Sequence, residues 1–401
     1  MKKYFKKILE KFIEGILLLS SSVTTITVLL IVIFLFREGK DVFKQSPVEN
    51  GFAIVVNKNN PVKEITSPQL KNIFDQKITK WSALGGKRDS IILFRLDDIG
   101  KYYTDAQLGD SLQFVGKCIT SLVDSQPGII AFVPEKYIDK NFAGRKLPMG
   151  NITVSQFISG KEWFPTAQPS AQLGVLPLIL GTLWVSIGAI LIALPLGLAT
   201  AVYMAEIAND KTRRILKPLI ELLAGIPSVV YGFFGLIVIV PLIQKVFNLP
   251  VGETGLAGSI VLGIMALPTI ITISEDAIRT TPRAMKEASL ALGANKWQTI
   301  HRVVLPYSIS GISAAAILGI GRAIGETMAV LMVTGNAAVI PHSILEPMRT
   351  IPATIAAELG EAPQGGLHFK ALFALGCILF IFTMIINLLV EYFSSRNKYS
   401  K

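Results

Sequence analysis

Six long apolar stretches divide this sequence, and they constrain the fold more than any other feature. A membrane-spanning helix needs about 20 predominantly apolar residues to cross about 30 Å of hydrocarbon, and each stretch is long enough. The chain is also 51% hydrophobic and only 17% charged, which is too apolar for an ordinary water-soluble globule. We therefore expect an all-α polytopic membrane protein whose six transmembrane helices cover approximately residues 15–36, 174–204, 219–246, 256–274, 308–334 and 371–390.

The basic residues predict the orientation of these helices. The formal net charge is +11, and Lys and Arg gather in MKKYFKKILEKF, EIANDKTRRILK, the loop 275–305 and the tail SSRNKYSK. All four segments lie on one side if the six spans are right. The positive-inside rule then places both termini in the cytoplasm, so the surplus is a topology signal and not a surface for nucleic acid. The first stretch exceeds the roughly 7–15 apolar residues of a secretory signal, which indicates a retained anchor.

Residues 37–172, between the first and second spans, have a different character. GFAIVVNKNN, SIILFRL and PGIIAFV read as strands, and GDSLQFVGKCITSLV reads as a helix. TSPQLKNIFDQ starts a further helix, with Thr66 or Ser67 as its N-cap and Pro68 in its first turn. We expect an extracytoplasmic α/β insert that ends in a polar linker, ISGKEWFPTAQPSAQ, between the first helix (residues 1–36) and a five-helix permease core (residues 173–401). Cys118 and Cys377 then fall in different compartments and cannot pair.

The loop 275–306 is the most specific feature of the chain. It is patterned as two short amphipathic helices with Gly293 as the break between them. Its spacing resembles the EAA loop of ABC-importer permeases, in which EAA, three residues, Gly and nine further residues precede Ile, any residue and Leu-Pro. Ser289 replaces the second Ala here, and Val303 replaces the Ile. The alternative is an ordinary basic loop.

The resemblance implies that this loop docks in a groove of an ATP-hydrolysing subunit. The chain has no GxxxxGK followed by Ser or Thr, so we expect ATP and Mg²⁺ to be used by a separate polypeptide. On this interpretation the chain is a transport subunit and not an enzyme, with no cofactor or metal of its own. The residues carried over to ATPase coupling are Glu287, Ala288, Ser289, Gly293, Leu305 and Pro306.

Two opposite charges interrupt the fifth apolar stretch, in GRAIGETMAVLMVTG. Charged side chains within membrane segments are costly and usually mark a substrate path. Arg322 and Glu326 are spaced i and i+4, which predicts that they share one helix face. A neutralising ion pair is the alternative, but Arg before Glu is the weaker order for a helical pair. Gly321 and Gly325, at GxxxG spacing, suggest that a neighbouring helix comes close.

A guanidinium suits tetrahedral oxyanions because its planar fork binds them bidentately. Hydrogen phosphate still carries a proton that it can donate to Glu326, whereas sulfate at neutral pH has none and would be repelled. Arg322 and Glu326 together therefore favour phosphate.

Family resemblance agrees with this interpretation. The EAA-like loop, GRAIGETMAVLMVTGNA and LLAGIPSVVYGFFGL resemble phosphate ABC permeases of the PstC type, from about residue 157 to the end. The resemblance implies a type I ABC-importer permease fold in a bacterial inner membrane, in contact with lipid, with Arg322 and Glu326 on the phosphate path. It also implies four partners: a second permease of the PstA type, two ATP-binding subunits of the PstB type, and a phosphate-binding receptor of the PstS type.

The insert is similar to one lobe of the periplasmic phosphate-binding proteins. Where those receptors hold the anion, this chain has FRLDDIGKYYTD, with Asp97 and Asp98 in a position to repel it. We expect a degenerate lobe that docks a receptor or shields the gate, with Arg95 as the one residue there that could still meet an anion. The rivals to phosphate import are an importer of another oxyanion, such as sulfate or molybdate, and a membrane-anchored receptor or sensor.

Overall fold

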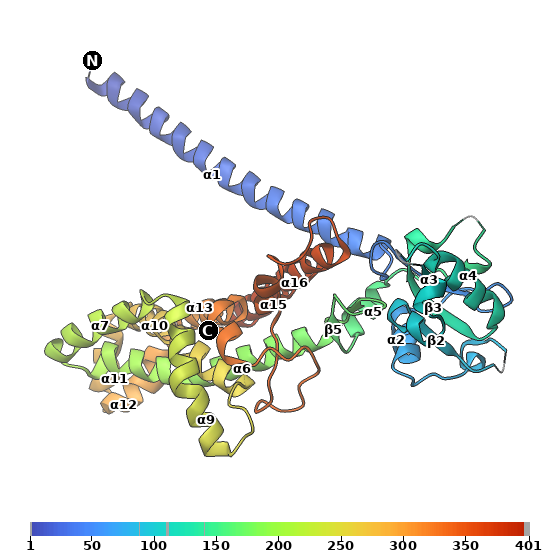
Figure 1. Ribbon diagram of the computed structural model, residues 1–401. Coiled ribbons are helices and arrows are strands. Elements are labelled where there is room, and N and C mark those ends of the chain that lie inside the picture. Colours follow the sequence, from blue (N-terminus) through green and yellow to red (C-terminus); the bar gives the residue numbers. More distant parts are fainter. Residues whose placement is uncertain (1, 88, 110–111, 140, 397–401) are drawn as a thin grey trace.

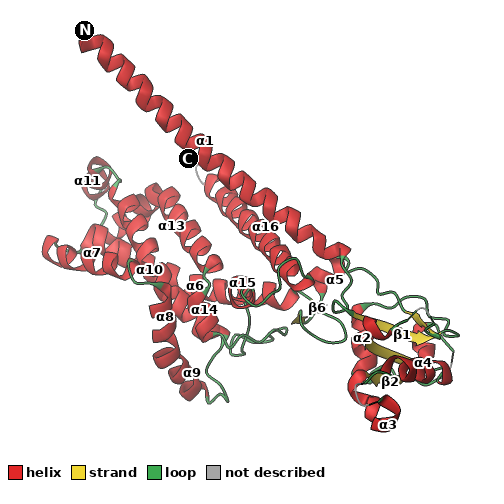
Figure 2. Cartoon of the chain, turned by 45° about the horizontal axis from the view of Figure 1, so that its top comes forward, coloured by secondary structure: helices red, strands yellow, loops and turns green. Residues whose placement is uncertain are grey.

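The computed structural model describes residues 2–87, 89–109, 112–139 and 141–396, and it confirms an all-α membrane architecture with a small α/β insert. Within these residues six helices are long and apolar enough to cross a membrane. They span Lys11–Lys44, Leu176–Ile207, Ser228–Phe247, Gly255–Arg279, Lys296–Gly325 and Leu367–Leu389. Figures 1 and 2 show the α/β lobe at one end of this helical assembly and α11 and α12 at the other.

Helix α10 (Gly255–Arg279) is the central helix of the bundle. It packs between α6 (Leu176–Val202) and α13 (Leu305–Gly325). Glycine permits this close approach, because a Cβ on Gly311 of α13 would lie 2.2 Å from the Cβ of Ala277 on α10. A Cβ on Gly197 of α6 would likewise lie 2.7 Å from the side chain of Ile270.

The third apolar stretch is broken into two parts. The sequence predicts one span from residue 219, but α7 (Asp210–Ala224) ends before α8 (Ser228–Phe234) begins. The break contains Pro227, which disfavours helical geometry at the residue before it. The third span is therefore α8 followed by the π-helical turn η6 (Gly235–Ile239) and α9 (Val240–Phe247).

The first helix, α1 (Lys2–Lys40), meets the rest of the bundle near its C-terminal end. There it packs on the last helix, α16 (Leu367–Arg396), and Figure 2 shows the two lying side by side. Phe34 meets Phe373 edge to face, with ring centroids 5.6 Å apart. The described side chains of α1 between residues 11 and 30 are exposed, as expected for a helix that faces lipid or a partner.

The α/β lobe is built on a four-stranded mixed sheet with the order β2-β3-β1-β4. The strands are Ile92–Arg95 (β2), Ile129–Pro134 (β3), Phe52–Asn57 (β1) and Gly144–Lys146 (β4). Strand β3 runs antiparallel to β1 and parallel to β2, and β4 runs antiparallel to β1. The three strands expected from the sequence are thus confirmed.

Alternating residues of β1 build two separate cores, because successive side chains of a strand point to opposite faces. Val55 packs with α4 (Val115–Ser125), and Val56 packs with α2 (Ser67–Phe74). The predicted start of α2 is confirmed, with Thr66 as N-cap. Helix α4 was expected from residue 109 but begins at Val115, after Gly109 and Leu112 take positive φ values of 80° and 57° that interrupt a helix. Residues 110–111 of that expected helix lie outside the described residues.

Shorter elements complete the chain. The lobe and its base add η1 (Asp41–Lys44), η2 (Trp81–Leu84), η3 (Leu96–Lys101), α3 (Asp105–Leu108), η4 (Glu135–Tyr137), α5 (Val154–Ser159), β5 (Trp163–Phe164) and β6 (Gln172–Leu173). The bundle adds η5 (Tyr203–Ile207), α11 (Arg283–Ala291), α12 (Lys296–Thr299), η7 (Ile300–Val304), α14 (Met328–Val333) and α15 (Ile351–Glu358).

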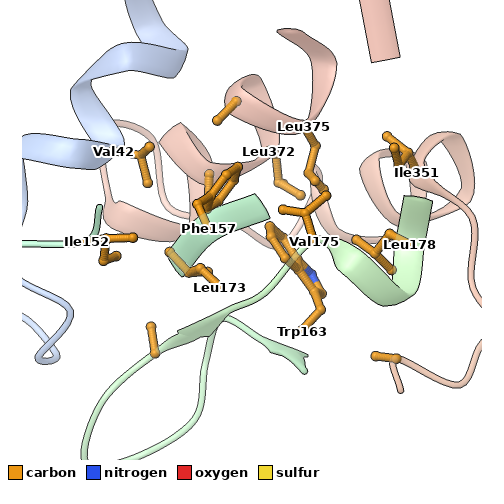
Figure 3. Packing of buried hydrophobic residues seen from close by; sticks show 14 of the residues in the cluster. Val42, Ile152, Phe157, Trp163, Leu173, Val175, Leu178, Ile351, Leu372 and Leu375 are labelled. Atoms are coloured by element: carbon orange, nitrogen blue, oxygen red, sulfur yellow. The ribbon is translucent and has the colours of Figure 1, made fainter. Parts of the chain in front are cut away.

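The segment predicted to be a polar linker is instead part of a packed junction between lobe and bundle. Strands β5 and β6 pair as a hairpin, and Trp163 is fully buried. Figure 3 shows its ring among Phe157 of α5, Val175 and the α16 residues Leu372 and Leu375. The apolar residues of this segment are few and separated by polar ones, and their partners lie about 200 residues away, so local sequence pattern does not reveal the junction.

A largely buried group of charged side chains lies at the junction between the lobe and the bundle. Glu358 of α15 accepts hydrogen bonds from the Trp163 indole at 3.0 Å and pairs with Arg349 Nη1 and His368 Nε2, each at 2.8 Å. Burial alone would raise the pKa of Glu358, but the bonds from His368 and Trp163 and the Arg349 charge outweigh it and place that pKa below the ordinary 4.5. A lowered folded-state pKa means that this stabilisation is present above pH 4.5 and is lost as the pH falls below it.

We expect Glu358→Gln to loosen the junction, because it leaves Arg349 and His368 without their carboxylate. Breaking a buried ion pair on one side costs about 3 kcal/mol. The measurement is the protection of the backbone amides of residues 163–173 against hydrogen exchange, relative to the intrinsic exchange rate at the same pH. This protection should fall in the variant at neutral pH, and in the wild type as the pH falls below 4.5. Glu361→Gln, which removes an exposed carboxylate from the following turn, serves as the control. Unchanged exchange in the Glu358 variant would show that the network does not secure the lobe.

Candidate functional site: a membrane-embedded arginine and an exposed helical hairpin

Arg322 lies in the last turn of α13 and points toward α10. Its Nη1 atom is 3.5 Å from the hydroxyl oxygen of Thr269, which occupies the middle of α10. Both side chains are half-buried. The guanidinium therefore sits well inside the length of the helical bundle, where a charge is costly unless it has a function.

Glu326 does not share a helix with Arg322, so the prediction of one common face is wrong. Helix α13 ends at Gly325, and Glu326 is extended, with φ −70° and ψ 134°. Glycine is a poor helix residue, and Thr327 is β-branched, so the local sequence favours a break here. In the described part of the chain the two charges form no ion pair with each other, and the neutralising-pair alternative is therefore wrong as well.

Each charge instead stabilises a different helix end. Arg322 lies at the C-terminus of α13, where the helix dipole favours a cation. The Glu326 carboxylate accepts a hydrogen bond of 3.4 Å from the Ala329 amide at the start of α14, where the dipole favours an anion. Arg322 thus has no carboxylate partner in the described chain.

Sequence reasoning missed two polar residues of the helical bundle. One is Thr269 of α10, which contacts Arg322, and the other is Tyr231 of α8, which is buried. The Tyr231 hydroxyl donates to the Leu223 carbonyl at 2.8 Å, across the break between α7 and α8. In the sequence, the one feature that marks these two residues is a polar side chain within an apolar stretch. Such residues also occur in membrane spans where they have no functional role.

Among the described residues, no neighbouring helix comes close to the GxxxG-spaced glycines. A Cβ built on Gly321 or Gly325 would have no described heavy atom within 4 Å, and nearby Leu318 is 53% exposed. The close approach of α13 to α10 occurs at Gly311 and Gly319 instead. The glycine pair therefore lies on a part of α13 that is open within this chain.

The predicted pair of short helices in the loop 275–306 is confirmed, and we refer to residues 283–299 as the hairpin. Helix α11 is followed by Gly293, whose φ of +85° is readily adopted only by glycine. Asn295 then caps α12 by accepting a 2.8 Å bond from the Gln298 amide. Ser289 and Thr299 join the two helices through their hydroxyl oxygens, 3.0 Å apart.

The hairpin exposes apolar side chains to an unusual degree. Leu292 is 90% exposed and Trp297 is 63% exposed, and Met285 and Leu290 are exposed beside them. No residue of α11 is buried. An apolar patch of this kind on a small polar element marks an interaction site. Of the residues predicted to couple to an ATPase, Glu287, Ala288, Ser289 and Gly293 lie in the hairpin, and Leu305 and Pro306 begin α13.

In the loop of the lobe that is expected to repel an anion, the Asp98 carboxylate is bound by other groups of this chain. Asp98 accepts a bond of 3.3 Å from the Arg95 amide and pairs with Lys101 at 2.6 Å. The bond from Lys101 and the Arg95 amide lower the pKa of Asp98. The Arg95 guanidinium lies over the Phe74 ring, 5.1 Å from its centroid. These contacts agree with a lobe that has no anion site at this loop.

Six apolar helices, with a half-buried cation among them and an exposed hairpin at one end, define a multi-pass membrane protein. The chain belongs to the family described as "Binding-protein-dependent transport system inner membrane component", whose profile matches residues 193–399. Residues 34–153 match a second family, "PBP superfamily domain".

Named relatives agree with this family. The chain is 42% identical over 250 residues to "Probable ABC transporter permease protein YqgH" of Bacillus subtilis, covering 62% of this chain and 81% of the relative. It is 39% identical over 274 residues to "Phosphate transport system permease protein PstC" of Mesorhizobium japonicum, covering 64% and 82%. Among solved structures, an inward-facing form of the MetNI methionine ABC transporter matches 56% of this chain and 94% of that chain, with 20% identity and a TM-score of 0.43.

Proposed function

We propose that this chain is the permease subunit of an ATP-driven phosphate importer and lines the translocation path with Arg322. The observation that carries the proposal is a guanidinium inside the bundle that has no carboxylate partner in the described chain. Its fork suits a tetrahedral oxyanion, and no internal anion has to be displaced before one binds. The relative named as a phosphate transport permease supports phosphate as that oxyanion.

Glu326 supplies selectivity at a separate step of the path. It follows the break after α13, and in the described chain it forms no ion pair with Arg322, so neither charge neutralises the other before an anion arrives. Hydrogen phosphate can donate its proton to this carboxylate, whereas sulfate cannot. The path opens by alternating access, in which the bundle presents Arg322 to each side of the membrane in turn.

A second permease of the PstA type completes the path. The part of α13 that carries Gly321 and Gly325 is open in this chain, and small residues allow a partner helix to approach closely. An ATPase dimer of the PstB type docks on the hairpin, where Leu292 and Trp297 offer apolar anchors. ATP and Mg²⁺ are bound by that partner.

The lobe lies outside the cytoplasm and receives a PstS-type receptor loaded with phosphate. This orientation follows from the basic hairpin end of the bundle, which the positive-inside rule assigns to the cytoplasm together with both termini. The packed junction around Trp163 fixes the lobe to α16, so a docked receptor would be held in one place relative to the path.

The test is receptor-stimulated ATP hydrolysis by the assembled complex in proteoliposomes. We expect about a tenfold stimulation by phosphate-loaded receptor and none by sulfate with the same receptor, within the usual range of coupling between sites. Stimulation by sulfate or molybdate instead would identify an importer of another oxyanion. A complex that assembles without any ATPase partner would favour a receptor or sensor.

A further inference from the structure

Few side-chain interactions join the hairpin to the helical bundle, although the chain itself continues from the hairpin into α10 and into α13. Helix α11 buries none of its residues. Among the described residues, the side chains of α11 form two polar interactions. One joins Ser289 to Thr299 within the hairpin, and the other joins Lys286 to Glu206, beyond it.

Glu206 belongs to a different membrane helix. It lies in η5, the π-helical turn (Tyr203–Ile207) that ends α6. The Glu206 side chain is 11% exposed and that of Lys286 is 22% exposed, so both charges are largely withdrawn from water. Such a pair resists separation because removing either partner leaves the other charge desolvated. It therefore differs from the exposed surface pairs of the chain, which contribute little.

Two π-helical turns, η5 and η7, lie next to this pair. A second π-helical turn, η7 (Ile300–Val304), joins the hairpin to α13 and shares a small core with the end of α6 that includes Val202, Ile278 and Val304. Single π turns inside helices occur often at functional sites. The ends of α6, α10 and α13 thus meet directly beneath the hairpin.

The geometry points to the Lys286–Glu206 pair as the element that transmits hairpin movement to α6. The hairpin is covalently continuous with α10 on one side and with α13 on the other, but it reaches α6 through this pair. With the pair intact, movement of α11 pulls on all three central helices. Without it, α6 follows through its packing against α10 and α13 and through the small core that it shares with η7. This inference rests on the proposed function, and it assigns Lys286 and Glu206 as positioning residues.

A nearby ion cluster has a different role and serves as a comparison. Glu275 of α10 is almost fully buried and binds Arg213 of α7 at 2.8 Å, with Lys217 and Arg279 at 3.6 Å. This cluster joins α7 to α10 and does not include the hairpin. Asp276, beside it, is 64% exposed and lies 3.6 Å from Lys217, so Asp276→Asn is a matched control for removing a carboxylate at this end of the bundle.

The test compares Glu206→Gln, Lys286→Gln and the exchanged pair Glu206→Lys with Lys286→Glu in the assembled complex in proteoliposomes. The readouts are receptor-stimulated ATP hydrolysis and the number of solute molecules imported per ATP. We expect each single variant to assemble and hydrolyse ATP but to import about tenfold fewer molecules per ATP. The exchanged pair should recover most of this loss, and Asp276→Asn should match the wild type.

Two results would overturn the inference: single variants with a wild-type import ratio, or an exchanged pair that assembles but remains as uncoupled as the single variants. If a single variant fails to assemble, the exchanged pair alone tests the inference. A restored ion pair must then restore the number of solute molecules imported per ATP. Failure of the proposed function is distinguishable, since it would appear in the wild type as a lack of phosphate import. The ratio would then be measured with the solute that the wild-type complex does import.

Discussion

Arg322→Gln should reduce ATP-dependent phosphate uptake about 50-fold while the complex still assembles. Glutamine keeps hydrogen-bonding capacity but removes the positive charge, and a charge-assisted hydrogen bond is worth about 2–3 kcal/mol. The guanidinium has a single polar contact with Thr269 and no ion pair in the described chain, so its loss leaves no buried carboxylate unpaired. The measurement is uptake of labelled phosphate into proteoliposomes at equal amounts of complex.

Arg322→Lys and Thr269→Val separate charge from geometry. Lysine keeps the charge without the planar fork, so it should retain part of the uptake. Thr269→Val removes the hydroxyl that lies 3.5 Å from the guanidinium and should cost less than the loss of the charge. If Arg322→Gln transports normally, the arginine stabilises only the end of α13, and phosphate selectivity lies elsewhere.

Leu292→Asp should uncouple the chain from its ATPase and lower uptake about 30-fold. Leu292 is 90% exposed at the tip of the hairpin, so the change costs the free chain almost nothing. Truncation of a central apolar anchor typically costs about 2 kcal/mol of binding, and a desolvated aspartate costs more. The measurement is the amount of ATPase subunit that co-purifies with the chain, followed by uptake.

Leu112→Asp, which changes an exposed leucine of the α/β lobe, is the matched control for this experiment. It should leave the recovery of the ATPase unchanged, because the lobe and the hairpin lie at opposite ends of the molecule. Full recovery of ATPase with the Leu292 variant would mean that the exposed apolar side chains of the hairpin do not form the docking surface.

Features encoded by local physics could be predicted from the sequence. The spans follow from apolar length, and the hairpin follows from amphipathic period and from a glycine that adopts φ +85°. The two cores of the lobe follow from strand alternation, as Val55 and Val56 of β1 show. The cap of α2 was readable because Thr66 and Gln69 stand at capping-box spacing.

Features that depend on distant partners could not be predicted in this way. The break at Glu326 separates two charges whose i, i+4 spacing favours one continuous helix, and packing of α14 against α8 accompanies it. Thr269 and Arg322 are brought together only by the packing of α10 on α13. Trp163 lies in a polar segment, yet it is buried because α15 and α16 supply its neighbours. For Thr269 and Trp163, tertiary contacts decide what the local sequence leaves open, whereas the break at Glu326 also has a local signal in Gly325 and Thr327.

Under the proposed function, this chain carries phosphate across a membrane at the expense of ATP in a partner subunit. The most direct measurement is uptake of labelled phosphate into proteoliposomes containing the assembled wild-type complex and receptor, with and without ATP and with sulfate in excess. Our account predicts ATP-dependent phosphate accumulation that sulfate does not reduce. Absence of ATP-dependent accumulation, or its abolition by sulfate, would contradict it.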